Sequence, residues 1–324
     1  MKLMHSEWEG RLDHWIHTLK KDLYEPLGEL SWTFFTATGQ IPPCDAEALA
    51  VNPAKEGMTW GRSREYAWFK SEFTLPGEAE GKKIVLNLAP GGESTLFVNG
   101  KSFGTYRASW LGVKHQFYSD NIVSECGKAG EHFDILMETY AGHDFPESEL
   151  GGCCTGPVLP GLYEPQDRRN RCTLGKCTYG IWNEEAYQLY MDVMTLRSLL
   201  RTLDSTSLRA AKVAEALERF TLTVDFELGK EERQACYIKA REELKGVLQA
   251  TNGSTMPKLY AMGHAHLDLV WLWPIDETRR KTSRTFAAQL RLLERYPEYR
   301  FIQSQPAEYE MCRRYYPELF QRIL

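Results

Sequence analysis

The stretch from Trp60 to Ala141 alternates short apolar runs with turn residues, and this pattern constrains the fold more than any other feature. The runs expected to form strands are Tyr66–Phe73, Lys83–Leu88, Thr95–Val98 and His132–Glu138. Asn99-Gly100 follows the third run and favours a tight hairpin, because both turn positions tolerate positive φ. Short strands with this spacing predict an antiparallel β-sandwich of jelly-roll-like type.

Apolar residues at helical spacing lie on either side of this stretch. They predict one helix near the N-terminus and several more after residue 183, one of which begins at Ser207, a good N-cap residue. The resulting domain boundaries are an N-terminal helical segment at 1–45, a β-sandwich at 46–182, a helical connector at 183–256 and an α/β unit at 257–324.

The last segment alternates between strand and helix patterns. Its predicted elements are a buried strand at Leu259–Met262, a helix at Glu277–Tyr296, a strand at Tyr299–Ser304 and a helix at Ala307–Tyr316. This order predicts the start of a parallel (β/α) barrel. A closed barrel takes about 250 residues, whereas only 68 follow Met256. We therefore expect a mixed fold whose barrel is truncated in this chain.

Composition excludes several functional classes. The chain has 324 residues, of which 43% are hydrophobic and 26% charged, and this composition is typical of a globular protein. No apolar run approaches the ~20 residues of a membrane span, and the N-terminus lacks a signal-peptide pattern. A net charge of −5 with scattered basic residues argues against a nucleic-acid partner. Eight cysteines without a secretory signal indicate reduced thiols and a cytoplasmic location.

Two histidines and an aspartate follow the predicted strand at Leu259–Met262. His264, His266 and Asp268 alternate in the sequence, so an extended chain would place all three on one face. Imidazole and carboxylate groups at a strand end suit a divalent ion such as Zn²⁺. Ordinary hydrogen-bonded polar residues at a strand end are the alternative interpretation. The alternation directly after a glycine favours a metal site.

The sequence around these residues resembles a known family. The run GHAHLDLVWLWP at 263–274, together with 277–281, 292–299 and 301–305, resembles the start of the catalytic domain of glycoside hydrolase family 38, whose members are α-mannosidases. Upstream, Trp60–Phe69, Thr74–Pro76 and Phe97–Gly100 resemble the ancillary β-sandwich of the cytosolic and bacterial branch of that family.

The resemblance implies a retaining α-mannosidase that removes terminal α-linked mannose from mannose-containing oligosaccharides with the help of Zn²⁺. His266 and Asp268 match the family's metal ligands, and Trp271 matches the residue that stacks on the bound sugar. His264 matches a histidine that is not a ligand, so we assign it a supporting role. The family is also compatible with a homo-oligomer.

The resemblance places the nucleophile, which also binds zinc, beyond Leu324, so no catalytic residue is assigned within this chain. Asp276, Glu277 and Glu308 are not taken as substitutes. A position near a helix N-terminus, where the macrodipole favours negative charge, explains Asp276 and Glu277. We therefore expect the chain alone to be an inactive N-terminal fragment.

Two alternatives remain at this point. An amidohydrolase-like enzyme also places a His-x-His pair at the end of a first barrel strand, with both histidines on metal. A non-catalytic carbohydrate-binding module would use surface aromatics such as Trp60, Trp68 or Trp110 to stack on sugars. Aromatic residues in alternating strands are more often core.

Overall fold

The computed structural model describes residues 6–37, 39, 41–62, 64–106, 121–142, 170–270 and 273–324. The chain divides into two compact units, each built from segments distant in sequence. The first unit comprises Met1–Glu25 with Ile181–Leu259, and the second comprises Pro26–Gly180 with Tyr260–Leu324.

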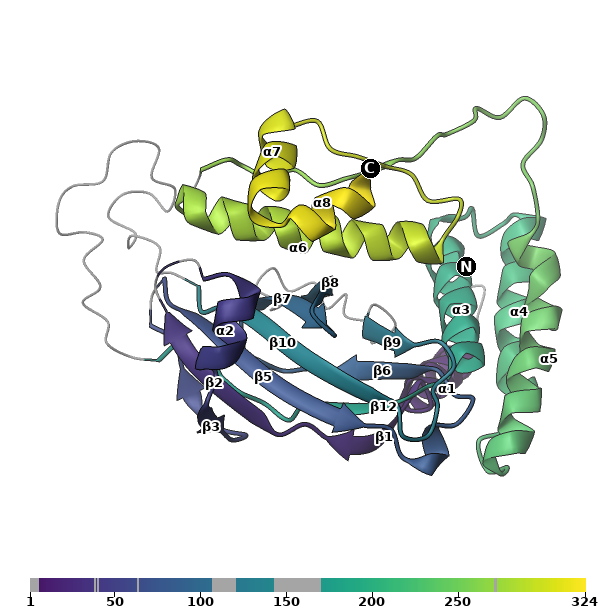
Figure 1. The fold of residues 1–324 in the computed structure, drawn as a ribbon. Coiled ribbons are helices and arrows are strands. Elements are labelled where there is room, and N and C mark those ends of the chain that lie inside the picture. Colours follow the sequence, from purple (N-terminus) through teal and green to yellow (C-terminus); the bar gives the residue numbers. More distant parts are fainter. Residues whose placement is uncertain are drawn as a thin grey trace, which may run out of the picture. The chain divides into compact units, whose positions relative to one another are not determined.

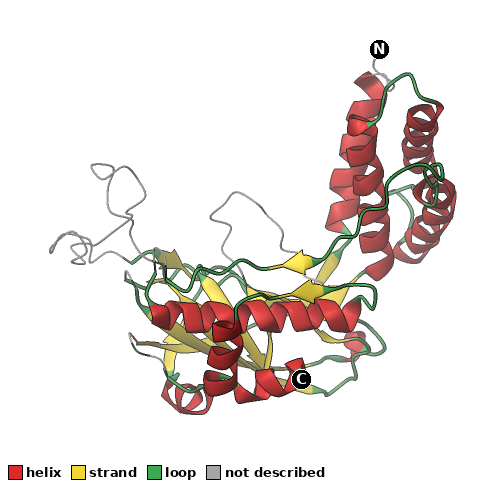
Figure 2. Cartoon of the chain, turned by 90° about the horizontal axis from the view of Figure 1, so that it is seen from above, coloured by secondary structure: helices red, strands yellow, loops and turns green. Residues whose placement is uncertain are grey.

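The first unit is built mainly from helices. Its helices are α1 (Ser6–Lys21), α3 (Glu184–Thr202), α4 (Leu208–Thr223) and α5 (Lys230–Leu248). Figure 2 shows these helices side by side. The α1 helix buries Leu12, Ile16 and Leu19, as its apolar spacing predicts. The predicted cap of α4 is confirmed, because the hydroxyl oxygen of Ser207 accepts a hydrogen bond from the Ala210 amide at 3.2 Å.

The second unit contains the sheets. Its strands are β1 (Tyr24–Glu29), β2 (Trp32–Ala37), β3 (Asn52–Ala54), β4 (Thr59–Trp60), β5 (Tyr66–Thr74), β6 (Ile84–Asn87), β7 (Glu93–Val98), β8 (Lys101–Tyr106), β9 (Ile122–Ser124), β10 (His132–Tyr140), β11 (Cys172–Thr173), β12 (Thr178–Trp182), β13 (Gly263–His264) and β14 (Phe301–Ile302). A six-stranded sheet has the order β3-β2-β5-β10-β7-β8, with every pairing antiparallel. A four-stranded sheet has the order β1-β12-β6-β9 (Figure 1).

The predicted hairpin between β7 and β8 is confirmed. Asn99 and Gly100 form its turn with φ values of 49° and 74°, as the dipeptide requires. The Asn99 side chain also accepts a hydrogen bond from the Asp134 amide at 2.9 Å, which ties the turn to the neighbouring strand β10.

The N-terminal segment at 1–45 is not helical throughout. After α1 it contains β1, β2 and the start of α2 (Pro43–Leu49). The β2 strand pairs with β5, where Phe34 lies opposite Phe69. The sequence of β2 shows no alternation of apolar and polar residues. Its strand conformation depends instead on pairing with β5, about thirty residues away along the chain.

Three helices cover one face of the six-stranded sheet: α6 (Ile275–Arg295), α7 (Pro306–Tyr315) and α8 (Pro317–Ile323) (Figure 1). A buried cluster joins Trp68 and Phe97 of the sheet to Phe286, Cys312 and Leu319 of these helices. On the other face, the Phe73 ring stacks on Tyr179 of the four-stranded sheet at 4.2 Å. The run Tyr66–Phe69 of β5 is therefore buried on both faces.

The mixed α/β architecture with antiparallel sheets agrees with the sequence, whereas the predicted barrel start is not confirmed. The strands β13 and β14 pair in parallel over only two residues each, and the described sheets do not close. The predicted strand at Leu259–Met262 is wrong, since Leu259 is 97% exposed and Met262 is 65% exposed. Pairing with β14 begins only at Gly263, and α6 buries its apolar face on the antiparallel sheet instead.

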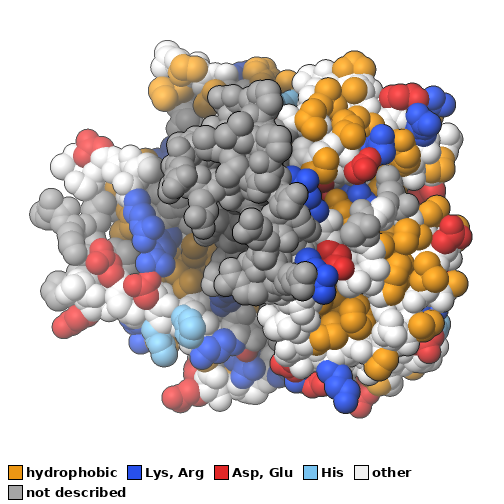
Figure 3. All heavy atoms as spheres, turned by 90° about the vertical axis from the view of Figure 1, so that its left-hand side faces the viewer, with side chains coloured by type: hydrophobic (Ala, Val, Ile, Leu, Met, Phe, Trp, Pro, Cys, Tyr) orange, Lys and Arg blue, Asp and Glu red, His pale blue; other side chains and the backbone are white. Residues whose placement is uncertain are grey.

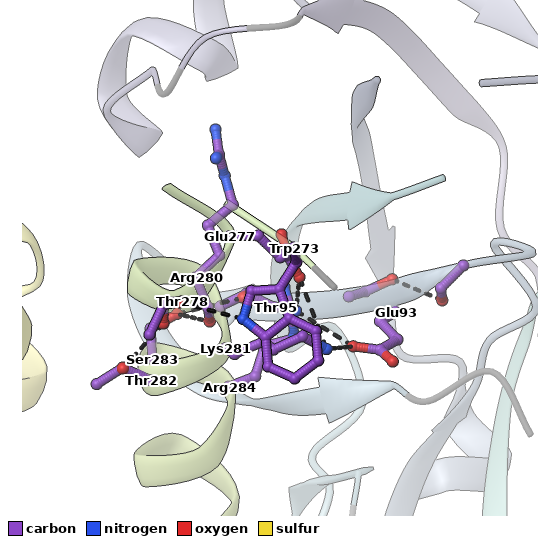
Figure 4. A network of polar contacts seen from close by, with 12 residues as sticks. Glu93, Thr95, Trp273, Glu277, Thr278, Arg280, Lys281, Thr282, Ser283 and Arg284 are labelled. Carbon is purple, nitrogen blue, oxygen red and sulfur yellow. Dashed lines mark hydrogen bonds and ion pairs between the residues drawn. The ribbon is translucent and has the colours of Figure 1, made fainter. Parts of the chain in front are cut away.

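A buried ionic network joins α6 to that sheet (Figure 4). The Arg280 guanidinium donates to the Glu138 carboxylate of β10 at 2.6 Å and lies 3.5 Å above the Tyr66 ring. The Tyr66 hydroxyl donates to Glu277 at 2.7 Å, and Glu277 also pairs with Arg284. Burial raises the pKa of Glu138 although Arg280 opposes the shift. All of these side chains are buried.

Strand β7 extends the network. Its Glu93 carboxylate accepts from Lys281 at 3.0 Å and from Arg284 at 3.2 Å. The Thr95 hydroxyl lies 3.4 Å from that of Ser283 (Figure 4). The N-terminal half of α6 is thus fixed to three adjacent strands, which determines where the loop preceding this helix can lie.

Arg280→Met should lower the free energy of unfolding by about 3 to 5 kcal/mol, because it leaves the Glu138 carboxylate buried and unpaired. Adding Glu138→Leu should recover most of that loss. Chemical denaturation measures both changes. Arg313→Met removes a guanidinium from an exposed pair with Glu310 and should change stability by less than about 0.5 kcal/mol. Equal effects of the two arginine substitutions would contradict the assignment.

Candidate functional site

The candidate site begins at Gly263, where a close contact permits no side chain. A Cβ atom on Gly263 would lie 2.0 Å from the hydroxyl oxygen of Tyr299. That hydroxyl donates to Gln289 of α6 at 2.6 Å, so the ring is held in place. The glycine before the histidines therefore allows β13 to pass directly against Tyr299.

His266 and Asp268 lie next to each other after β13. His266 Nε2 is 3.2 Å from Asp268 Oδ1. Their side chains are 75% and 40% exposed, respectively, whereas Leu267 between them is buried. The extended alternation thus turns Leu267 inward and both polar groups toward solvent.

His264 does not join this pair. Its Nε2 atom lies 3.5 Å from the Ser304 hydroxyl, at the end of the neighbouring strand β14. Within the described part of the chain, His264, His266 and Asp268 do not bring three ligand atoms within 4.8 Å of one another. The three ligand atoms expected on one face therefore do not converge on a single point.

The spacing of the His266 and Asp268 donor atoms fits one zinc ion. Zinc is bound at about 2.0 to 2.2 Å by imidazole nitrogen and carboxylate oxygen, and a tetrahedral angle then separates two such donors by about 3.3 to 3.5 Å. The observed separation is 3.2 Å. At this distance the two groups contact each other directly, so binding an ion would replace that contact with two metal–ligand bonds.

The loop after Asp268 is tied to the first turn of α6. The Thr278 hydroxyl donates to the backbone carbonyl of Leu269, and the Trp273 indole donates to Thr278 at 3.1 Å. Trp271, the predicted sugar-stacking residue, lies outside the described residues.

The acidic residues near the site have structural partners or are buried. Asp276 pairs with Arg279 at 2.5 Å in the exposed first turn of α6, as expected for a helix start. Glu277 differs from that expectation, because its side chain is buried in the ionic network. Glu308 of α7 is completely buried, and burial raises its pKa to about 7.

A second group of potential ligands was not anticipated from the sequence. Glu72, His132 and Asp134 bring three ligand atoms within 4.8 Å of one another on the exposed side of β5 and β10. Strand register places Glu72 opposite Asp134, so no local sequence signal marks the group. Exposed charges of this kind commonly pair without a metal, and we assign no ion to them.

The tryptophans considered for sugar binding on the sandwich are core residues where the structure describes them. Trp60 is 2% exposed and its indole donates to the Pro90 carbonyl at 2.9 Å, while Trp68 is 1% exposed. Neither ring presents a face to a sugar. Trp110 lies outside the described residues.

Comparison with known proteins identifies the segment that carries this site. Residues 256–324 match the family model described as the glycosyl hydrolases family 38 N-terminal domain. We refer to residues 256–324 below as the family 38 segment. His266 and Asp268 lie within this family 38 segment, as do α6, α7 and the β13–β14 pair.

Curated relatives extend the similarity upstream of the family 38 segment. Alpha-mannosidase G of Dictyostelium discoideum is 26% identical over 86% of this chain and 24% of its own length. Human alpha-mannosidase 2C1 is 23% identical over 89% of the chain and 26% of its own length. An alpha-mannosidase of Saccharomyces cerevisiae is 27% identical over 59% of the chain and 18% of its own length. The chain thus spans about a quarter of the length of the first two relatives.

Surface features bear on the partners expected from the sequence. Among the described helices, none is long and apolar enough to cross a membrane. On the face drawn in Figure 3, Lys and Arg side chains are interspersed with Asp and Glu side chains.

Gly263→Ala should lower the free energy of unfolding by about 1 to 3 kcal/mol, because the added methyl group must displace the hydrogen-bonded Tyr299 ring. Thermal unfolding measures the change. Gly253→Ala adds the same methyl group where no atom lies within 4 Å and should be nearly neutral. A neutral result at Gly263 would show that Tyr299 moves aside without cost.

Glu308 should make stability depend on pH. Its carboxyl group has a pKa of about 7 when folded, against an ordinary value of 4.5, so the folded state binds this proton more tightly. The resulting stabilisation is complete below the ordinary pKa and is lost as pH rises through about 7. Between about pH 5 and pH 8 the free energy of unfolding should fall by about 2 to 3 kcal/mol through this group.

Glu308→Gln removes the ionisable proton while retaining the size of the side chain. Denaturation curves for this variant, recorded across the same pH range, should show a correspondingly smaller decline than the unsubstituted chain shows. Identical pH profiles for the two proteins would contradict the raised pKa of Glu308.

Proposed function

We propose that this chain contributes the beginning of a zinc-assisted retaining α-mannosidase that removes terminal α-linked mannose from mannose-containing oligosaccharides. The observation that carries the proposal is the His266–Asp268 pair, whose donor atoms lie 3.2 Å apart within the family 38 segment. The relatives named alpha-mannosidase support the substrate class.

In this proposal each residue of the motif has a separate task. The His266 imidazole and the Asp268 carboxylate hold the ion, and the carboxylate also offsets part of its charge. A bound zinc ion would supply a Lewis acid that orients the sugar. Trp271 supplies a ring face for stacking on the sugar. His264 supports the loop near Ser304 and does not bind metal.

Bond cleavage requires groups that we do not assign here. A retaining glycosidase uses a carboxylate nucleophile and a carboxylic acid about 5 Å apart. Glu277 is already engaged by Tyr66 and Arg284, and Glu308 is buried, so neither is proposed for this role. We propose that the nucleophile lies beyond Leu324 and that the 324-residue chain alone is inactive.

The amidohydrolase-like alternative requires both histidines of the His-x-His pair on metal. The separation of His264 from His266 and Asp268 favours the α-mannosidase. A stoichiometry of one zinc ion per longer chain supports the proposal, whereas two would support the alternative. The buried Trp60 and Trp68 argue against a separate carbohydrate-binding module. We further propose a cytoplasmic location and a homo-oligomeric assembly, both from the family resemblance.

The 324-residue chain should bind zinc weakly and show no hydrolysis of an aryl α-mannoside, because two protein ligands only partly satisfy the ion. His266→Ala and Asp268→Ala should each reduce the measured zinc affinity about ten-fold or more. Calorimetric titration with zinc measures this loss. A longer chain that includes the downstream nucleophile should both bind zinc tightly and cleave the substrate.

His132→Ala serves as the control, because it disrupts the other group of potential ligands. It should leave the zinc affinity unchanged. Loss of zinc binding in this variant, with none in the His266 variant, would assign the ion to the exposed trio. Turnover by the 324-residue chain would refute its inactivity.

A further inference from the structure

A buried glutamine side chain holds the backbone between His264 and His266. Gly263 pairs with Phe301 and His264 with Ile302, so the next step of this parallel register would place Ala265 opposite Gln303. At that step the Gln303 side-chain amide donates to the Ala265 carbonyl at 2.8 Å. A side chain therefore continues the contact between the strands where the backbone pairing ends.

Glu308 fixes the orientation of this amide. The Gln303 nitrogen also donates to Glu308 Oε2 at 2.6 Å, and both side chains are buried. Reversing the amide would turn its oxygen toward the Ala265 carbonyl, which can only accept. The Gln303 oxygen accepts a further bond from the Gln305 amide at 3.3 Å. Only one of the two amide orientations satisfies all these contacts.

A second tether lies on the other side of the metal-binding pair. The Thr278 hydroxyl donates to the carbonyl of Leu269, directly after Asp268. Residues 265 and 269 are thus held by side chains from two different segments, one following β14 and one on α6. The exposed His266 and Asp268 side chains lie on the short stretch between these two points.

We propose that Gln303, oriented by Glu308, is a positioning residue that holds the Ala265 carbonyl and thereby keeps His266 and Asp268 at metal-binding spacing. This inference rests on the proposed function only for the identity of the ion. The local order of the loop is a property of this chain's own residues. Outer hydrogen bonds of this kind typically change metal affinity 10- to 100-fold, which is about the size of effect expected here.

The test compares three variants of the 324-residue chain. Gln303→Glu removes the donor to Ala265 and places two carboxyl groups together. The double variant, Gln303→Glu with Glu308→Gln, swaps the two side chains. It restores a donor between residues 303 and 308 but leaves the Ala265 carbonyl without its amide partner. Glu308→Gln alone keeps an acceptor for Gln303 and should preserve the tether.

Amide hydrogen exchange of residues 260–270 and titration with zinc alone provide the two readouts. Gln303→Glu should speed exchange in this stretch about three- to ten-fold and lower the zinc affinity about ten-fold. The double variant should recover the melting temperature but neither the slow hydrogen exchange nor the zinc affinity of the unsubstituted chain. Glu308→Gln should match the unsubstituted chain in both. Gln321→Glu, the same change at an exposed position of α8, is the control and should alter nothing.

Two outcomes would overturn the proposal. One is an unchanged rate of amide hydrogen exchange in Gln303→Glu. The other is full recovery of hydrogen-exchange protection and zinc affinity in the double variant, which would reduce Gln303 to a packing role. Failure of the proposed function looks different: the unsubstituted chain would bind no zinc, while the exchange data would still decide whether Gln303 orders the loop.

Discussion

The arrangement of the second unit depends on a buried ion pair, Arg280 with Glu138. Removing two charges from water costs several kcal/mol for each ion, and only close, well-oriented contacts offset that cost. Here the guanidinium meets both a carboxylate and the face of Tyr66. A rotated or shifted α6 would leave these charges buried without partners. The pair therefore favours one docking position of the helix over others that apolar packing alone would tolerate, and the surrounding contacts of Glu277 and Glu93 strengthen that preference.

The docking position of α6 also positions the candidate site, because the helix follows the site closely along the chain. The α6 helix begins at Ile275, seven residues after Asp268 along the chain, and its Thr278 holds the Leu269 carbonyl. The position of α6 on the sheet thus fixes one end of the loop that carries His266 and Asp268. The other end is fixed by β14 and Gln303. The antiparallel sheet contributes no residue to the motif, but it positions the helix that holds one end of the motif's loop.

Sequence alone predicted those features that depend on local chemistry. The Asn99-Gly100 hairpin and the Ser207 cap follow from turn and capping preferences and are found as expected. His266 and Asp268 were proposed as a metal pair from their residue types and spacing, and the structure places the two side chains in contact at 3.2 Å. Features set by distant partners were missed. The apolar run at Leu259–Met262 resembles a buried strand, yet pairing begins only after it. Glu277 resembled an ordinary acidic helix start, because nothing near it in sequence reveals that Tyr66 and Arg284 enclose it.

The buried run Tyr66–Phe69 in β5 explains why the sandwich pattern and the family 38 segment occur in one compact unit. A strand with one face toward solvent alternates apolar and polar residues, whereas Tyr66, Ala67, Trp68 and Phe69 are buried in succession. Such a run needs cover on both faces, and here α6 and α7 from the family 38 segment supply the second cover. Each part thus hides apolar surface that the other would expose. The β-sheet and the family 38 segment are consequently expected to fold as one cooperative unit rather than as a binding module attached to an enzyme.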